Sequence, residues 1–317
     1  MATNKSTLFD PEVVQDLVNK VKGHSSLALL SAAEPIAFNG NKEFEFSMDK
    51  EVDIVGEAGA KSEGGITITP KTIIPLKFEY GARVSDEFMI ATEEEKIEIL
   101  KAFNEGFSKK VARGIDIAGF HGLNPRSGQP SLVVGTNNFD SQVDQTVVYD
   151  STKPDENVED AIALFDDSDI NVTGMAMAPA FRSALAAMKD SRGGKMYPDL
   201  AWGRNPGTIN GLKVDVNNTV KFGANTTDKA IIGDFESAFK WGFAKEIPLK
   251  VIEYGDPDNS GYDLAGHNQV YLRAEVYVGW AILDKLAFAR IVGNASGTSG
   301  STSTSTSTST STSTSGN

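Results

Sequence analysis

Oxygen-bearing side chains alternate in one short segment of the chain, which reads Asp256-Pro-Asp258-Asn-Ser260-Gly261. This is the pattern of the first half of an EF-hand loop, whose side-chain oxygens bind Ca²⁺ and whose sixth residue is glycine. The twelfth position holds His267 where an EF-hand has glutamate, and the flanking residues are typical of strands. We therefore favour a strand-connecting turn, expect no bound metal, and keep Asp256, Asp258 and Ser260 as the only candidate ligands.

Basic side chains gather in a second segment, the Gly-, Arg- and Pro-rich stretch from Ser191 to Pro206. Arg192, Lys195 and Arg204 could together bind a phosphate group. A Walker-type phosphate loop is excluded, because Gly193-Gly194-Lys195-Met196 has neither the glycine spacing nor the hydroxyl residue that follows the lysine. We interpret the stretch as a solvated surface or as a contact between subunits.

Residues for covalent or redox catalysis are scarce. The chain has three histidines and no cysteine, and no serine stands in a G-x-S-x-G motif. Its 43 acidic residues give a formal net charge of −13, which argues against binding to phosphate backbones as the main activity. No apolar run approaches the roughly 20 residues that span a bilayer, and the N-terminus has no apolar segment of a signal peptide. We expect a soluble, non-enzymatic protein with no catalytic residues, cofactor or membrane contact.

The longest predicted element is a helix from Thr92 to Gly122. Thr92 and Glu95 form a capping box, and Gly122 is a suitable stop. At 1.5 Å per residue this helix would be roughly 40 Å long, which suits a plate-like subunit better than a compact enzyme. One stripe of apolar residues runs along it: Ile97, Leu100, Phe103, Phe107, Val111, Ile115 and Ala118.

A long β-hairpin is predicted before this helix. Apolar residues alternate from Phe44 to Ile54 and again from Ile66 to Tyr80, on either side of the Gly-rich tip Gly56–Gly65. An isolated two-stranded ribbon is only marginally stable in water. We therefore expect the ribbon to lie on another surface.

The remaining segments are an arm, a mixed α/β region and a tail. The arm contains an amphipathic helix at Pro11–Lys22, and packing on its own domain is favoured over packing on a neighbour. A helix and a strand follow at Pro179–Lys189 and Gly174–Ala178, and a final strand pair is expected to return to the long helix. The tail from Gly293 to Asn317 is a Ser/Thr repeat that cannot form a core.

This order of parts resembles the major capsid protein of tailed bacteriophages, the Hong Kong 97-type fold, over about Pro11 to Val292. The motifs that carry the resemblance are Val55-Gly56-Glu57, Arg83-Val84-Ser85-Asp86-Glu87, Asp116-Ile117-Ala118, Asn210-Gly211-Leu212-Lys213-Val214 and Ala287-Phe288-Ala289-Arg290.

The resemblance implies an α+β fold with five parts. They are an N-terminal arm (1–43), an extended β-hairpin loop (44–84), a peripheral domain with the long spine helix (85–129 and 245–292), an inserted α/β axial domain (130–244) and a disordered Ser/Thr-rich tail (293–317). The side chains expected to contact neighbouring subunits are Glu57, Lys61, Glu63, Arg83, Arg192, Lys195 and Arg204.

The implied function is structural: self-assembly into pentamers and hexamers of an icosahedral virion shell, formed in the bacterial cytoplasm around double-stranded DNA that is bound without sequence specificity. Scaffolding is expected from a separate protein, since a Met closely precedes the arm, and portal and head-completion proteins are expected partners. Some members of the family crosslink through a lysine in the extended loop. Lys61 lies near the tip, but no partner motif is found, so this chemistry is not assigned. The alternatives are an encapsulin-type shell around protein cargo and a carboxylate-based hydrolase.

Overall fold

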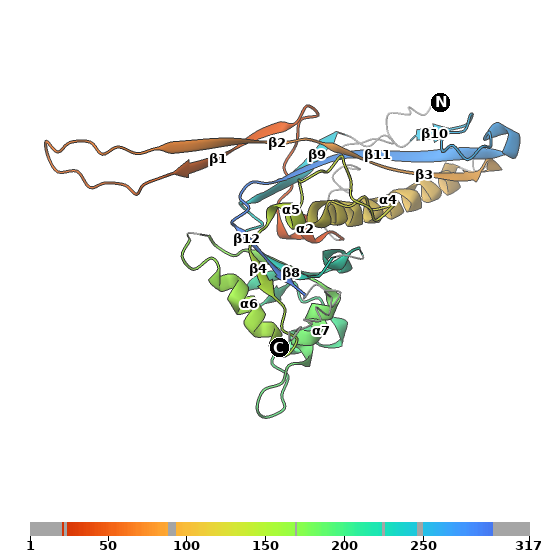
Figure 1. Ribbon diagram of the computed structural model, residues 1–317. Helices are drawn as coiled ribbons and strands as arrows, with labels where there is room; N and C mark the ends of the chain where they lie inside the picture. The colour runs from red at the N-terminus through yellow and green to blue at the C-terminus, as the bar shows by residue number, and fades with distance from the viewer. Residues whose placement is uncertain are drawn as a thin grey trace, which may run out of the picture.

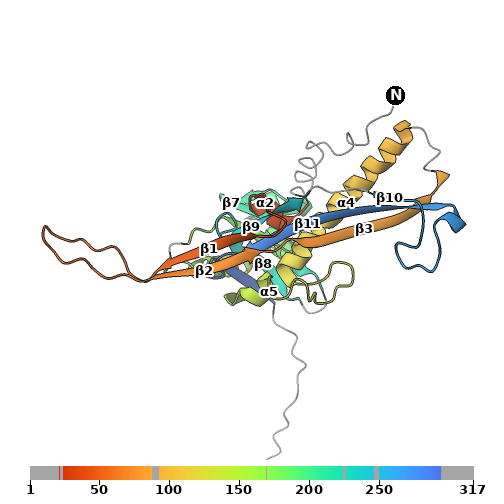
Figure 2. The ribbon, with the colours of Figure 1, turned by 90° about the horizontal axis from the view of Figure 1, so that it is seen from above.

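The computed structural model describes residues 21, 24–87, 93–168, 170–223, 226–245 and 250–293. The chain forms an elongated platform, a wedge beneath it, and a two-stranded ribbon that projects from one end of the platform (Figure 1). Viewed from above, the ribbon continues the long axis of the platform (Figure 2). Apart from Val21, the helix predicted at Pro11–Lys22 lies outside the described residues, as does the tail beyond Gly293.

The platform is a four-stranded sheet with one long helix, α4, along one face (Figure 1). The central strand β11 pairs antiparallel with all three of its neighbours. Phe107, Val111 and Ile115 of α4 share one buried core with alternate residues of β11, because the helix and strand periods place an apolar face from each at the contact. The elements are α4 (Glu93–His121), β3 (Leu76–Ser85), β9 (Phe239–Lys245), β10 (Lys250–Ile252) and β11 (Gln269–Ile282).

Helix α4 confirms the predicted long helix and its apolar stripe where the side chains are described. It ends as expected at Gly122, which has a φ of +65° and donates its N–H to the carbonyl of Ala118 at 2.9 Å. The capping box at Thr92 lies outside the described residues.

The wedge is a mixed six-stranded sheet in the order β4-β12-β8-β5-β7-β6. Its strands alternate between two cores: Met175 and Met177 face helices α6 and α7, whereas Ala176 faces α2 and the end of α4. The strands are β4 (Thr146–Val148), β5 (Gly174–Met177), β6 (Thr208–Ile209), β7 (Leu212–Val216), β8 (Asp228–Gly233) and β12 (Phe288–Val292). The helices of the wedge are α6 (Pro154–Ala163), α7 (Pro179–Ala187), η2 (Pro198–Gly203) and η3 (Asn218–Lys221).

Aromatic packing joins platform and wedge. Phe139 of the short helix α5 (Phe139–Gln142) is fully buried and touches the rings of Phe120 on α4 and Phe288 on β12, with centroids 5.6 and 4.9 Å away. Its ring also contacts Phe235 and Phe239. The two bodies therefore share one continuous core.

The described part of the arm packs on its own chain, as the sequence favoured. Helix α2 (Ser26–Leu30) is almost entirely buried between platform and wedge. The following residues add to the edge of β9, where Glu34 donates its N–H to the carbonyl of Trp241 at 2.9 Å. This approach depends on Gly242, since a Cβ there would lie 1.7 Å from the carbonyl oxygen of Glu34.

The ribbon is shorter than the predicted hairpin of residues 44–84. Strands β1 (Asn41–Met48) and β2 (Ile66–Ile73) pair antiparallel, and β3 pairs with β11 instead. Pro75, which has no N–H to donate, separates β2 from β3. Residues 49–65 form an unpaired loop that includes Val52 and Ile54, whose alternation predicted strand; they are 92% and 97% exposed.

Two further predicted boundaries are wrong. Strand β9, placed at the end of the inserted region (130–244), pairs with β11 in the platform. Strand β12, expected to return to the long helix with β11, pairs with β4 and β8 in the wedge. Alternating apolar residues predict a strand, but they do not predict which strand it will pair with. The alternation only determines which side chains face the core.

Candidate functional site

The β1–β2 ribbon exposes apolar side chains along its length. Phe44, Met48, Ile66 and Ile68 are all largely exposed. Its base is anchored by Lys71, which donates to the carbonyl of Ile282 at 3.0 Å. An exposed two-stranded ribbon with apolar side chains is a typical surface for association.

The charged residues expected at the tip lie in the loop 49–65. Glu57, Lys61 and Glu63 are all exposed. Two contacts brace this loop: Lys50 donates to the carbonyl of Glu63 at 3.1 Å, and Gly65 donates its N–H to Asp49 at 2.6 Å. The tip therefore exposes side chains of both positive and negative charge to solvent.

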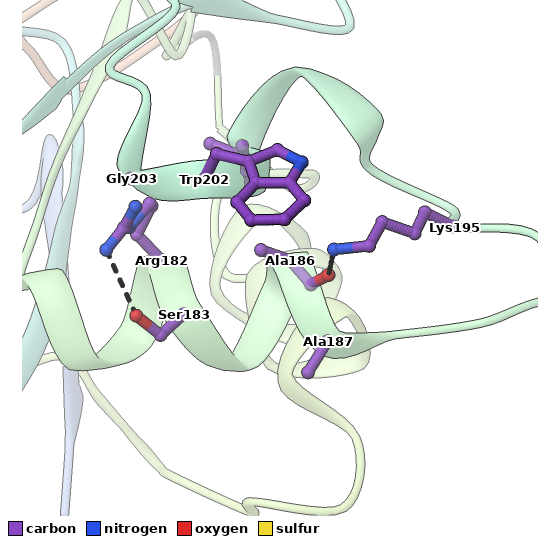
Figure 3. A pocket seen from close by; sticks show the side chains of 8 residues that line it. Arg182, Ser183, Ala186, Ala187, Lys195, Trp202 and Gly203 are labelled. Carbon is purple, nitrogen blue, oxygen red and sulfur yellow. Dashed lines mark hydrogen bonds between the residues drawn. The ribbon is translucent and has the colours of Figure 1, made fainter.

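A second exposed surface lies on α7 in the wedge (Figure 3). A shallow hollow of about 220 Å³ there is lined by Arg182, Ser183, Lys195 and Trp202, among others. Lys195 reaches across it to the carbonyl of Ala186 at 3.3 Å. Trp202 is 100% exposed and has a φ of +57°, which is unusual for a bulky residue.

The other two basic residues of this region do not line the hollow. Arg192 and Arg204 are exposed, one in the loop after α7 and one just after η2. Both residues were grouped with Lys195 in the sequence, whereas Trp202, an exposed residue of a type enriched in protein interfaces, was not.

Arg83 does not lie on a free surface. Its guanidinium, 15% exposed as a side chain, donates to Asp258 and Asp256 of the loop between β10 and β11, at 2.6 and 2.7 Å. It also donates to Ser260 at 2.5 Å. The hydrogen bond from Arg83 lowers the pKa of Asp258 to about 2. The oxygens considered as calcium ligands thus bind an arginine of their own chain, and Arg83 has few donors left for a neighbouring subunit.

Asp116 of α4 is fully buried at the centre of a hydrogen-bond network that the sequence did not reveal. Its carboxylate accepts from Ser25 Oγ at 2.5 Å, from the N–H of Ser26 at 2.9 Å and from Thr219 Oγ1 at 2.9 Å. The N–H of Leu27 and the amide of Asn217 complete the set. Burial raises the pKa of Asp116 to about 6, against the lowering effect of these bonds. The network joins the arm, α4 and the wedge.

A second buried cluster lies at the C-terminal end of α4. His121 Nδ1 lies 2.9 Å from Asp140 Oδ2, and its Nε2 lies 2.9 Å from the carbonyl oxygen of Thr219. Arg290 Nη2 lies 2.7 Å from Asp140 and 2.8 Å from Asp228. The carbonyl that His121 meets belongs to Thr219 on η3 and not to the end of its own helix. The carboxylate partners of His121 come from distant segments and could not be identified from local spacing.

The pKa values in this cluster are shifted. Burial, the largest influence, lowers the pKa of His121, but the hydrogen bond and charge of Asp140, with smaller effects from Thr219 and Asp228, raise it overall. Burial and the charge of Asp140 raise the pKa of Asp228 to about 7. His121 and Asp228 therefore hold their protons more tightly than they would in water.

The chain matches known proteins in both sequence and fold. The sequence profile of the phage capsid family matches residues 6–293. The chain belongs to the phage capsid family. A solved structure from Mycobacterium phage Ogopogo is 32% identical, with a TM-score of 0.70, covering 85% of this chain and 92% of that one. One from Gordonia phage Cozz is 26% identical, with a TM-score of 0.69, covering 85% and 86%.

The fold of the capsid subunit extends to more distant proteins. The capsid of a native GTA particle has a TM-score of 0.62 at 15% identity, covering 84% of this chain and 89% of that one. A search of the curated proteins finds no match. Within the described residues, no helix has the length and apolar content needed to cross a membrane.

The capsid subunit is thus a structural, non-enzymatic protein of the phage shell with the Hong Kong 97-type fold. It assembles with copies of itself, and its place is the virion capsid. Neither an encapsulin nor a carboxylate-based hydrolase is favoured by these comparisons. Its functional sites are therefore contact surfaces rather than a catalytic centre.

Proposed function

We propose that the subunit forms pentamers and hexamers of an icosahedral shell and that the β1–β2 ribbon lies over a neighbouring subunit. The observation that carries this proposal is the ribbon itself, which projects from one end of the platform (Figure 1) and exposes Phe44, Met48 and Ile66. A neighbouring copy would cover these side chains and remove apolar surface from water. Closed shells made from one chain need such repeated contacts between copies.

In this arrangement the platform is the peripheral domain and the wedge is the axial domain, which gathers around the five-fold and six-fold axes. Support comes from the basic residues Arg192, Lys195 and Arg204, which are exposed in the loop after α7 and near η2. Trp202, which is fully exposed, lines the same hollow as Lys195. Tryptophan and arginine are both enriched in protein interfaces.

We also propose the partners that the resemblance to tailed-phage capsid proteins implies. The shell encloses double-stranded DNA without sequence-specific contact, in keeping with a net charge of −13. A separate scaffolding protein, a portal and head-completion proteins act with the subunit during assembly in the bacterial cytoplasm.

Cryo-electron microscopy of the purified full-length chain tests the proposal. We expect uniform closed shells or capsomer rings in which the ribbon of one subunit crosses the next. Strictly monomeric behaviour at high protein concentration would overturn it, as would shells in which the ribbon touches no other copy. Particles purified from infected cells should contain nucleic acid and no enzyme cargo.

A further inference from the structure

We propose that His121, Asp140 and Asp228 bind one divalent metal ion of the zinc class where platform and wedge meet. The three residues come from the end of α4, from α5 and from β8. Each contributes one ligand atom, and these atoms all lie within 4.8 Å of one another.

The spacing fits a small ion. His121 Nδ1 lies 2.9 Å from Asp140 Oδ2 and 3.9 Å from Asp228 Oδ2. Zinc binds nitrogen and carboxylate oxygen at about 2.1 Å, so tetrahedral ligands lie about 3.4 Å apart. The observed distances lie on either side of this value. An imidazole with two carboxylates is a ligand set that zinc and similar ions accept.

The histidine is held in the tautomer that a metal needs. Its Nε2 faces the carbonyl oxygen of Thr219 at 2.9 Å, and a carbonyl can only accept. Nε2 therefore carries a proton, so that Nδ1, after losing the proton it shares with Asp140, directs its lone pair at a metal ion between the ring and the carboxylates. Metal-binding histidines usually donate their second N–H to such a carbonyl.

Asp228 distinguishes a metal ion from a simple proton. Its side chain is 0% exposed, and its Oδ2 has no hydrogen-bond partner among the described residues, while Oδ1 accepts from Arg290 at 2.8 Å. A single proton between His121 and Asp140 would pair those two groups only, so the buried Asp228 Oδ2 would need a second proton, shared with Asp140. One metal ion would bind all three atoms.

Charge and access agree with this assignment. Once a metal ion displaces the protons of the cluster, a neutral imidazole, two carboxylates and one guanidinium leave a net charge of −1, which attracts a cation. Arg290 holds an oxygen of each carboxylate and so orients the other oxygens. The side chain of Asp140 is 27% exposed, which gives an ion a path from solvent. The bound ion would fix the end of α4 to the wedge.

Zinc titration of the EDTA-treated full-length chain tests the site, independently of shell assembly. Calorimetry should find one ion per chain, and zinc should raise the melting temperature. Asp228→Asn removes one ligand, yet its amide can donate to Asp140 and its oxygen can accept from Arg290, so the variant should fold. We expect zinc affinity to fall more than about a hundredfold, because changes around metal ligands already cost about 10–100-fold.

The control is the double variant His24→Gln/His267→Gln, which removes the other two histidines and should bind zinc like the wild type. Binding lost in this control but kept in Asp228→Asn would overturn the proposal. So would a wild-type chain whose melting temperature and heat signal do not respond to zinc, which is the result expected if a proton alone occupies the cluster. Bound Co²⁺ should give a visible absorption spectrum that Asp228→Asn loses.

Discussion

The guanidinium of Arg83 lies 2.6 Å from Asp258, so that a side chain of β3 fills the loop whose alternating oxygens match half of an EF-hand. Asp256, Ser260 and the carbonyl of Tyr262 lie within hydrogen-bond distance of the same nitrogen, whose two hydrogens they share with Asp258. The oxygen pattern therefore does mark a cation site. The cation is an arginine, and its role is to hold the loop between β10 and β11 against β3.

Arg83→Ala should free this loop. The guanidinium of Arg83 has five N–H donors and holds Asp256, Asp258 and Ser260 together. Water molecules that replace it would bind each of these side chains separately. Hydrogen exchange of residues 255–262 should become faster, while exchange in α4 stays unchanged. Arg83→Lys should give an intermediate rate, because an ammonium lacks the planar fork. Equal protection in wild type and Arg83→Ala, or a calcium-dependent rise in the wild-type melting temperature, would contradict this account.

Asp116→Asn should change how stability depends on pH. Burial raises the pKa of Asp116 from 3.8 to about 6. Between these values the folded chain binds a proton that the unfolded chain does not, so this carboxyl makes folding more favourable as the pH falls through that window. The asparagine does not titrate. The unfolding free energy of the wild type should therefore gain about 1–3 kcal/mol relative to the variant between pH 7 and pH 4.

Urea unfolding at several pH values measures this difference. Asp160→Asn is the matched control, because Asp160 is an exposed carboxylate on α6. It tests whether the loss of any carboxylate charge, rather than the loss of Asp116, produces the effect. A pH-independent difference for Asp116→Asn would mean that the carboxyl does not titrate in this range.

Local patterns predicted the elements that local forces determine. The stripe from Phe107 to Ala118 specified α4, and the buried run at Gly174 with Pro179 specified β5 and α7. Both signals depend on residues within a few turns of each other. The resemblance to the capsid family then predicted how these elements are arranged in space. The spacing of apolar residues alone could not predict that arrangement.

Long-range partners were beyond such patterns. Asp228 is 107 residues from His121 in sequence, so its place in the cluster depends on how β8 enters the wedge. The mistaken positions of β9 and β12 have the same cause, because strand pairing is decided by the whole sheet. Asp116 and His121 did offer one signal: polar residues between apolar ones at the end of a long helix. Such residues, if buried, need partners.

Phe107→Ala should destabilise the folded subunit more than Phe103→Ala. Phe107 is buried in the main core between α4 and β11, whereas Phe103 is only partly buried. Removing a buried phenyl ring leaves a cavity and should cost about 3–5 kcal/mol. The half-buried ring should cost about 1–2 kcal/mol, because less apolar area leaves water on folding. Chemical denaturation of unassembled subunits measures both. Equal losses would show that the two rings are covered alike.

Deleting Gly56–Gly65 separates folding from assembly. The segment lies in the loop 49–65, where every residue is exposed, so its loss should leave the unfolding transition of the subunit unchanged. The strands β1 and β2 can still pair through the shorter loop. Because the tip carries Glu57, Lys61 and Glu63, its loss should reduce the yield of shells seen by electron microscopy and sedimentation. A control that replaces these three side chains with alanine keeps the length of the loop and isolates the charges. Normal shell yield from the deleted chain would remove the tip from the contacts between subunits, and loss of subunit folding would show that the tip stabilises the monomer instead.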